Sequence, residues 1–188
     1  MATTTPKASP RDRLLDAAAE LSYREGVSIG VEALCRAAGV SKRSMYQLFS
    51  SKEEMLAAGL ERRNESYEAR FRAGSGTPRE RVLHVFACLA ESAADPAYLG
   101  CPYLAALVEL KDPAHPAHRV AREAKDRLRS VFRTLAEEGG AHDPGLLARQ
   151  LTLVFDGASA RAGAGVETLD DGLATTMATT LMDAAGMK

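Results

Sequence analysis

The residues best suited to chemistry lie between Ala38 and Leu56, in a segment that reads AGVSKRSMYQLFSSKEEML. Cationic, hydroxyl and amide side chains gather there on the polar face of a short predicted helix. They are Ser41, Lys42, Arg43, Ser44, Tyr46 and Gln47. Side chains of these types bind phosphate oxygens and the edges of bases. The pattern therefore predicts a DNA-binding surface.

This short helix needs a turn before it and an apolar face beneath it. Gly39 lies where the preceding helix must end, because a residue without a Cβ tolerates the positive φ of such a turn. Ser41 is a suitable N-cap for the helix that follows. Apolar side chains then recur at i, i+3 and i+4, at Met45, Leu48 and Phe49. These signals predict a helix-turn-helix motif over about residues 30–49.

The next helix begins with a capping signal and a lysine. The run from Ser50 to Glu54 contains two overlapping Ser-x-x-Glu boxes, so a helix starts at about Ser50 or Ser51. Between Arg36 and Lys52 there are four basic residues and no acidic one, although the net charge of the chain is −1. Because DNA affinity requires positive charge only at the contact face, this distribution agrees with a local DNA-binding surface that includes Lys52.

The composition predicts an all-α protein. The 188 residues include 34 alanines and 22 leucines against ten valines and one isoleucine, which favours helices over strands. The chain has no apolar run long enough to span a bilayer and no signal-peptide core at its start, so we expect a cytoplasmic protein with no membrane partner. Three cysteines without finger-like spacing argue against structural disulfides and a zinc site, and no cofactor is expected.

Nine helical segments and no strand are predicted. Their approximate ranges are residues 10–24, 31–38, 41–49, 51–72, 77–94, 102–110, 116–138, 143–158 and 168–185. Residues 1–8 are expected to form a disordered lead and residues 9–56 a compact three-helix head. Residues 57–188 then form a larger helical body, into which the fourth helix leads from the head.

The head resembles the tetracycline-repressor (TetR) family of bacterial transcription regulators. The likeness follows the pattern A-G-V-S-x-x-x-x-Y-x-x-F-x-x-K-E. It is carried by Leu34, Ala38, Gly39, Val40, Ser41, Lys42, Tyr46, Phe49, Lys52, Glu53 and Leu56. A looser likeness extends into the body, through GCPYL at residues 100–104 and DPGLLARQLTLVFDGA at residues 143–158.

The resemblance implies a homodimeric repressor whose two heads read adjacent major grooves of a palindromic operator on double-stranded DNA. An unidentified small-molecule effector bound by residues 57–188 would release the DNA, and the same domain would dimerise. Tyr46 and Lys52 match positions that contact phosphate in the family, and Lys42 to Ser44 match positions that touch bases and phosphates. Many members have Thr or Ser where this chain has Gly30, so the resemblance implies no side-chain phosphate contact there.

Two further sets of residues are expected in the body. The effector cavity is expected to be lined by Tyr67, Phe71, His84, Cys88, Tyr103, Leu104, Leu107 and Phe132. The last two helices carry apolar stripes too long for the body alone, and the small residues between Gly157 and Gly165 allow close approach. A four-helix dimer interface is therefore predicted from Leu147, Leu151, Val154, Ala158, Leu169, Leu173, Met177 and Leu181.

Several alternatives remain open at this stage. Cys101 follows a glycine at a helix entrance, so it could be a redox sensor or an enzyme nucleophile, although a buried packing role is favoured. His115 and His118 could hold a metal, but no acidic companion is evident, and no metal is expected to bind there. A constitutive architectural DNA binder would also carry this head. The sequence contains no GxSxG, HExxH or P-loop motif, which argues against an enzyme.

Overall fold

The computed structural model describes residues 8–188, apart from the side chain of Glu65. The predicted disordered lead falls, except for Ala8, outside the described residues. Within them the chain forms nine helices and no strand, which confirms the all-α prediction. The helices are α1 (Pro10–Glu25), α2 (Val31–Ala38), α3 (Lys42–Leu48), α4 (Lys52–Arg72), α5 (Pro78–Ala93), α6 (Pro102–Glu109), α7 (Pro116–Glu138), α8 (Pro144–Gly163) and α9 (Leu173–Ala184).

Side-chain caps begin several helices at the positions that the sequence indicates. The Ser41 hydroxyl caps α3, and the Ser51 hydroxyl caps α4, each by accepting a hydrogen bond from the backbone N–H three residues on. Thr77 and Glu80 form a complete capping box at the start of α5. Proline occupies the first turn of α1, α5, α6, α7 and α8. Most helix starts are thus specified by local chemistry.

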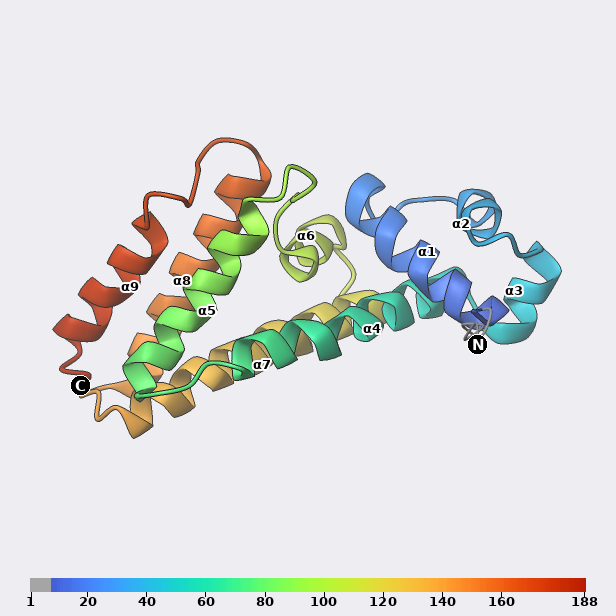
Figure 1. The fold of residues 1–188 in the computed structure, drawn as a ribbon. Coiled ribbons are helices and arrows are strands. Elements are labelled where there is room, and N and C mark those ends of the chain that lie inside the picture. Colours follow the sequence, from blue (N-terminus) through green and yellow to red (C-terminus); the bar gives the residue numbers. More distant parts are fainter. Residues whose placement is uncertain (1–7) are drawn as a thin grey trace, which may run out of the picture.

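The molecule is elongated, with the head at one end and the last helices at the other (Figure 1). Helices α1 to α3 form the head, and α4 leads from it into the body with α7 packed alongside. Helices α5, α8 and α9 pack together at the far end, where the chain terminates. The short helix α6 lies between this group and the head and packs against α7. This arrangement places α3 far from α8 and α9.

Two hydrophobic clusters form the core. The first joins the head to the body, because it contains Leu14, Leu34 and Met45 together with Tyr103 of α6 and Val120 of α7. The second lies wholly in the body and includes stacked rings of Phe86 and Phe132, whose centroids are 5.8 Å apart. Since the first cluster continues into α6 and α7, the head packs on the body rather than hanging from α4 alone.

The C-terminal helices differ from the prediction at their boundaries. Helix α8 continues through the small-residue segment to Gly163 instead of ending at residue 158, and α9 begins at Leu173 instead of residue 168. Gly172 precedes α9 in the left-handed conformation, with φ 75° and ψ 17°. Asp171 Oδ1 accepts a hydrogen bond of 2.9 Å from Leu173 N. The turn chemistry at these two residues, not the apolar stripe, determines where α9 starts.

No helix among residues 8–188 is both long and apolar enough to cross a membrane.

Candidate nucleic-acid interface and internal cavity

A tight turn fixes α3 against the rest of the head. Gly39 ends α2 with φ 61° and ψ 40°, a left-handed conformation that favours glycine, and a Cβ there would meet nothing within 4 Å. The backbone conformation, not crowding, therefore selects glycine. From α1, Arg13 donates through Nε to the Ala38 carbonyl at 2.8 Å and through Nη2 to the Gly39 carbonyl at 3.4 Å. The first helix thus holds the turn that aims α3.

The underside of α3 is anchored by two of the three apolar residues that were predicted. Met45 is fully buried, and Phe49 is buried with the guanidinium of Arg11 5.3 Å from its ring centroid. Leu48 does not belong to this face, because its side chain is 40% exposed. The helix ends at Leu48, and Phe49 turns inward from extended backbone instead of from the helix. The predicted i, i+3, i+4 face is wrong for Leu48.

The opposite side of α3 presents the predicted contact residues to solvent. Lys42, Arg43 and Gln47 are exposed, and Tyr46 is 56% exposed, although aromatic side chains are usually buried. Ser44 is half-buried and shares a 2.9 Å hydrogen bond between its hydroxyl and that of Ser41. These two serines therefore stabilise the start of the helix, and the longer side chains supply the free surface.

Lys42 forms an ion pair within the head. Its Nζ donates to Glu32 Oε1 of α2. This hydrogen bond raises the pKa of Lys42 and lowers the pKa of Glu32. Both side chains are exposed, and an exposed pair of this kind contributes little to stability. Lys42 can therefore exchange Glu32 for a phosphate at small cost.

Lys52 has a defined position at the start of α4. Its half-buried side chain donates from Nζ to the Ile29 carbonyl at 3.3 Å, just before α2. This hydrogen bond ties the first turn of α4 to the segment that leads into α2. Gly30 caps α2 without a side chain. The ammonium of Lys52 thus lies close to this helix start, where Gly30 offers no side chain to a phosphate.

A cavity of about 380 Å³, partly open to solvent, lies between α4 and α7, next to the start of α6. Three of the predicted effector residues line it, Tyr67, Phe71 and Tyr103. The other described lining residues come mainly from α4 and α7. They are Asn64, Glu68, Arg72, Arg81, Cys101, Ala124, Lys125, Arg127, Leu128, Ser130, Val131, Thr134 and Leu135.

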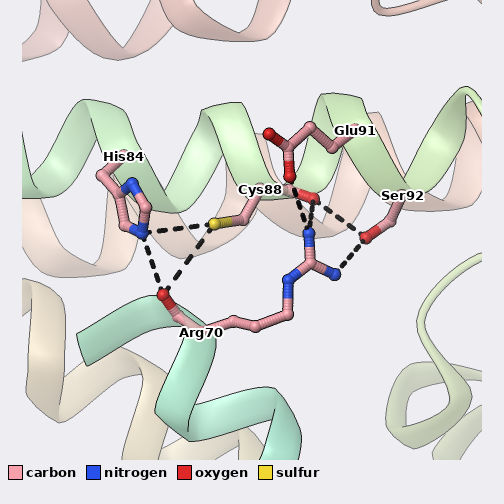
Figure 2. Close-up of polar contacts among 5 residues, drawn as sticks. All are labelled: Arg70, His84, Cys88, Glu91 and Ser92. Carbon is pink, nitrogen blue, oxygen red and sulfur yellow. Dashed lines mark hydrogen bonds and ion pairs between the residues drawn. The ribbon is translucent and has the colours of Figure 1, made fainter. Parts of the chain in front are cut away.

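His84 and Cys88 were predicted to line the cavity but lie elsewhere, at the contact between α5 and the end of α4 (Figure 2). His84 Nε2 is 2.9 Å from the Arg70 carbonyl and 3.4 Å from Cys88 Sγ. The Arg70 guanidinium reaches across to Ser92 and Glu91 of α5, each at 3.0 Å. Burial raises the pKa of the Cys88 thiol. This cluster fastens α4 to α5.

Three further predicted cavity residues belong to the core. Leu104 and Leu107 are half-buried and pack against the cluster that joins α6 to the head. Phe132 is fully buried in the second cluster. None of the three lines the cavity, because Leu104 and Leu107 pack against the first cluster and Phe132 stacks on Phe86 within the second.

The polar residues of the cavity were not predicted from the sequence. Asn64 is only 5% exposed, and Lys125 forms an ion pair with Asp156 of α8. Arg127 pairs through Nε with Glu68 Oε1 at 2.5 Å. Since α7 carries many charges along its length, nothing local to the sequence separates Lys125 and Arg127 from the helix's solvent-facing cations.

Cys101 lines the cavity and is buried at the entrance of α6. Burial raises the pKa of its thiol, and the nearby Lys125 ammonium acts in the opposite direction without cancelling the shift. The thiol therefore stays protonated at neutral pH, which argues against a nucleophile. His115 accepts a hydrogen bond from Ala117 N at 3.1 Å and caps α7. Among the described residues, no three His, Cys, Asp or Glu side chains are close enough to hold a metal.

The outer face of α8 and α9 forms a shallow apolar groove. Of the residues predicted for a dimer interface, Val154, Ala158, Leu173 and Met177 line it, with Leu169 as its largely buried floor. Leu147 and Leu151 are buried inside the protomer and present no outer surface, while Leu181 is half-buried and packs against the second cluster. Leu153, which was not predicted, is 73% exposed there. The stripe facing the core and the stripe facing outward lie on adjacent sides of α8.

A short exposed cationic helix, held by a glycine turn against two supporting helices, is the architecture of a helix-turn-helix DNA-binding protein. Residues 14–58 match the sequence model of the bacterial regulatory proteins of the tetR family. The chain is 58% identical to a TetR transcriptional regulator of Streptomyces avermitilis MA-4680, over 96% of this chain and 100% of that one, with a TM-score of 0.92. The chain belongs to the TetR family.

Two other relatives agree with this assignment. SCO4454, a TetR-family transcriptional regulator from Streptomyces coelicolor, is 26% identical, with 94% of each chain covered and a TM-score of 0.82. The HTH-type transcriptional regulator YjdC of Escherichia coli is 29% identical over 85 residues, which is 45% of this chain and 44% of YjdC. The match thus spans less than half of that curated relative. The protein is a DNA-binding transcriptional regulator and not an enzyme.

Proposed function

We propose that the protein is a homodimeric repressor that binds a palindromic operator in the bacterial cytoplasm and is released by a small-molecule effector. One observation carries the proposal: the same short element, α6 with its preceding loop, contacts both the internal cavity and the DNA-binding head. A ligand in the cavity can therefore act on α3 through direct contacts. A constitutive architectural binder would have no use for such a connection.

The DNA contacts are assigned from exposure on α3. Arg43 and Gln47 lie one turn apart on the outward side and are the base-reading candidates, because their side chains can form paired hydrogen bonds to guanine and adenine edges. Lys42, Tyr46 and Lys52 flank them and are assigned to phosphates. Ser41 and Ser44 contribute indirectly by holding the helix start, since the Ser41 hydroxyl accepts from Ser44 N and pairs with the Ser44 hydroxyl.

Two sets of hydrogen bonds support the coupling between cavity and head. The Tyr23 hydroxyl of α1 donates to the Gly100 carbonyl at 3.0 Å and accepts from Leu99 N at 2.7 Å, next to Cys101 in the cavity wall. At the other end of α6, Glu109 accepts from Val27 N at 2.9 Å and from Ser28 N at 3.1 Å. A ligand that shifts α6 would therefore displace the segment leading into α2.

A second copy of the chain is the proposed occupant of the apolar groove on α8 and α9. Exposed apolar side chains along the groove include Leu153, Leu173 and Met177. Glycine and alanine beside them, at Gly157 and Ala158, allow two helices to approach closely. Pairing of α8 and α9 with their symmetry mates would form a four-helix interface and place two heads side by side.

The DNA assignment is tested by fluorescence anisotropy with an operator selected from a random DNA library. Arg43→Ala should weaken specific binding roughly 5- to 150-fold and relax the preference at one base position. Lys52→Ala should weaken binding to all sequences alike and reduce the slope of affinity against salt by about one. Arg129→Ala, on the exposed side of α7, is the control and should change neither quantity.

The same assay separates the possible outcomes. If Arg43→Ala and Lys52→Ala both bind like the wild type while remaining folded by circular dichroism, the assigned face is wrong. If DNA binds at α3 but no compound that occupies the cavity releases it, the effector-controlled part of the proposal fails and the architectural alternative is favoured.

A further inference from the structure

One side of the internal cavity is an aromatic wall formed by Tyr67, Phe71 and Tyr103. Tyr67 packs edge to face on Phe71 with ring centroids 4.5 Å apart and on Tyr103 at 5.8 Å. Burial raises the pKa of Tyr67 well above its usual value, so its hydroxyl stays neutral. The cavity volume of about 380 Å³ lies within the range of small-molecule sites. A compact apolar body fits against this wall.

The charged part of the cavity lining is mainly cationic. Its described charged members are Arg72, Arg81, Lys125, Arg127 and Glu68. The single carboxylate is already engaged twice, because Glu68 binds the Arg127 and Arg72 guanidinium groups at 2.5 Å each. A cationic ligand would have to displace one of these arginines. An anionic ligand would share the lining cations with the carboxylates that already pair with them, Glu68 among them.

One nitrogen in this lining lacks a hydrogen-bond partner. Arg127 Nη2 is buried, and no acceptor among the described atoms lies within hydrogen-bonding distance of it. The rest of the guanidinium is held in place, since Nε binds Glu68 and Nη1 lies 4.0 Å from Glu123. A buried donor without an acceptor is unfavourable, and an incoming acceptor recovers that free energy.

The other cation that α7 contributes to the lining differs from Arg127 in this respect. Lys125 is paired with Asp156, and its ammonium also lies 5.3 Å from the centroid of the Phe155 ring. Its charge is therefore balanced within the protein. Of these two cations, the half-buried Arg127 is the one with hydrogen-bonding capacity left over, and guanidinium geometry suits a carboxylate.

We propose that the effector is a small apolar acid whose carboxylate is bound by Arg127 and whose aromatic or branched body packs on the aromatic wall. This inference rests on the proposed function, because it names the chemical class of the effector that the cavity would take. It also predicts discrimination against amides and amines of the same shape, since neither presents an anion to Arg127.

Three compounds of one shape test this discrimination: cinnamate, cinnamamide and cinnamylamine. Their affinities for the full-length wild-type protein are measured by isothermal titration calorimetry at neutral pH. Cinnamate should bind roughly 10- to 100-fold more tightly than cinnamamide, because the hydrogen bond to Arg127 becomes charge-assisted. Cinnamylamine should bind most weakly. An amide or amine that matches cinnamate, or no binding of cinnamate in the millimolar range, would overturn the inference.

Two variants change the cavity charge in opposite directions. Arg127→Met should reduce the affinity for cinnamate to that of cinnamamide and leave cinnamamide unchanged. Glu68→Gln removes the competing carboxylate and should raise the affinity for cinnamate, which keeps the test decisive if Arg127→Met folds poorly. Arg129→Met, two residues along α7 and outside the lining, is the matched control and should leave both affinities unchanged. Unaltered cinnamate binding in Arg127→Met and Glu68→Gln would contradict the assignment.

An operator-release assay distinguishes this inference from the proposed function. If a neutral compound occupies the cavity and releases DNA with no advantage for the acid, the effector mechanism stands and the acidic class is wrong. If cinnamate binds through Arg127 and DNA stays bound, the acidic site stands and control of DNA by this site is wrong.

Discussion

Gly163 and Gly100 touch backbone to backbone, and their contact joins the last turn of α8 to the loop before α6. A Cβ built on Gly163 would lie 2.3 Å from Gly100 N and 2.3 Å from the carbonyl carbon of Leu99. Both atoms are backbone and cannot swing aside. Because Leu99 and Gly100 also bind the Tyr23 hydroxyl, this loop connects the head with the helix that bears the proposed dimer face.

Gly163→Ala should therefore destabilise the protein. The added methyl group forces α8 away from the loop at Leu99 and Gly100, an overpacking that costs about 1–3 kcal/mol. Urea unfolding followed by circular dichroism measures the change. Gly145→Ala in the first turn of α8 is the control, since its Cβ would lie at an ordinary 3.5 Å from Asp143 Oδ1. Equal stability of Gly163→Ala and the wild type would show that the close contact does not exist in solution.

Glu109→Gln should loosen the link between α6 and the head. A carboxylate accepts from both Val27 N and Ser28 N, whereas an amide presents one acceptor oxygen and places an NH₂ group against the other N–H. Losing one such bond costs about 1–3 kcal/mol of local stability. Hydrogen exchange read by mass spectrometry should accelerate in the peptide containing Val27 and Ser28. Glu137→Gln at the end of α7 is the control, and matching exchange in both variants would contradict the link.

Tyr98 should make stability depend on alkaline pH. Its hydroxyl is 2.7 Å from that of the buried Ser159. Burial raises the pKa of Tyr98 from 10.0 to about 12, and the Ser159 hydrogen bond only partly opposes this shift. Since the folded pKa lies above the unfolded one, the stabilisation is complete below pH 10.0 and declines as the pH rises toward 12.

The comparison that isolates this effect is Tyr98→Phe. Below pH 10.0 the variant should be less stable than the wild type by about 1–3 kcal/mol, because Ser159 loses its partner. The difference in free energy of unfolding between wild type and variant should narrow between pH 10.0 and 12. In this range Tyr98 ionises in the unfolded wild type but not in the folded one, and the variant has no such group. A difference in free energy of unfolding between the two proteins that stays constant from pH 10.0 to 12 would contradict this prediction.

Leu153→Glu should break the proposed dimer without unfolding the protomer. Leu153 is 73% exposed at the groove on α8 and α9, so a glutamate is harmless in the monomer but would be buried uncharged or unpaired in a dimer. The dissociation constant of the dimer, measured by sedimentation equilibrium, should rise roughly 100-fold or more. Val108→Glu on α6, where the valine is 62% exposed, is the control and should remain dimeric. If Leu153→Glu still sediments with the mass of a dimer, the interface lies elsewhere.

Local chemistry made most of the fold predictable. The head followed from a glycine at a left-handed position, a serine cap and a cationic helix, because each signal acts within one or two turns of chain. Helix starts at Ser51 and Thr77 were predicted for the same reason. The start of α9 was misplaced because the apolar stripe begins before the Asp171–Gly172 turn that begins the helix.

The cavity could not be predicted to the same extent, since periodicity states which residues share a helix face but not what that face meets. His84 and Cys88 share one side of α5 with each other, and packing turned that side toward Arg70 instead of the cavity. Leu151 and Leu153 lie on one helix, yet the first is in the core and the second on the outer surface. Both stripes are apolar, so the sequence pattern alone did not show which of them faces the core and which faces outward.

The sequence alone was enough to predict the class of protein and the short cationic helix that carries the proposed DNA contacts, because a capped helix of this kind is defined by neighbours along the chain. The tertiary structure alone decided the chemistry of the cavity. Arg127 and Glu68 are 59 residues apart, and only the packing of α4 against α7 brings them together at the cavity. Burial and long-range pairing depend on how helices are rotated against one another, which no local signal encodes.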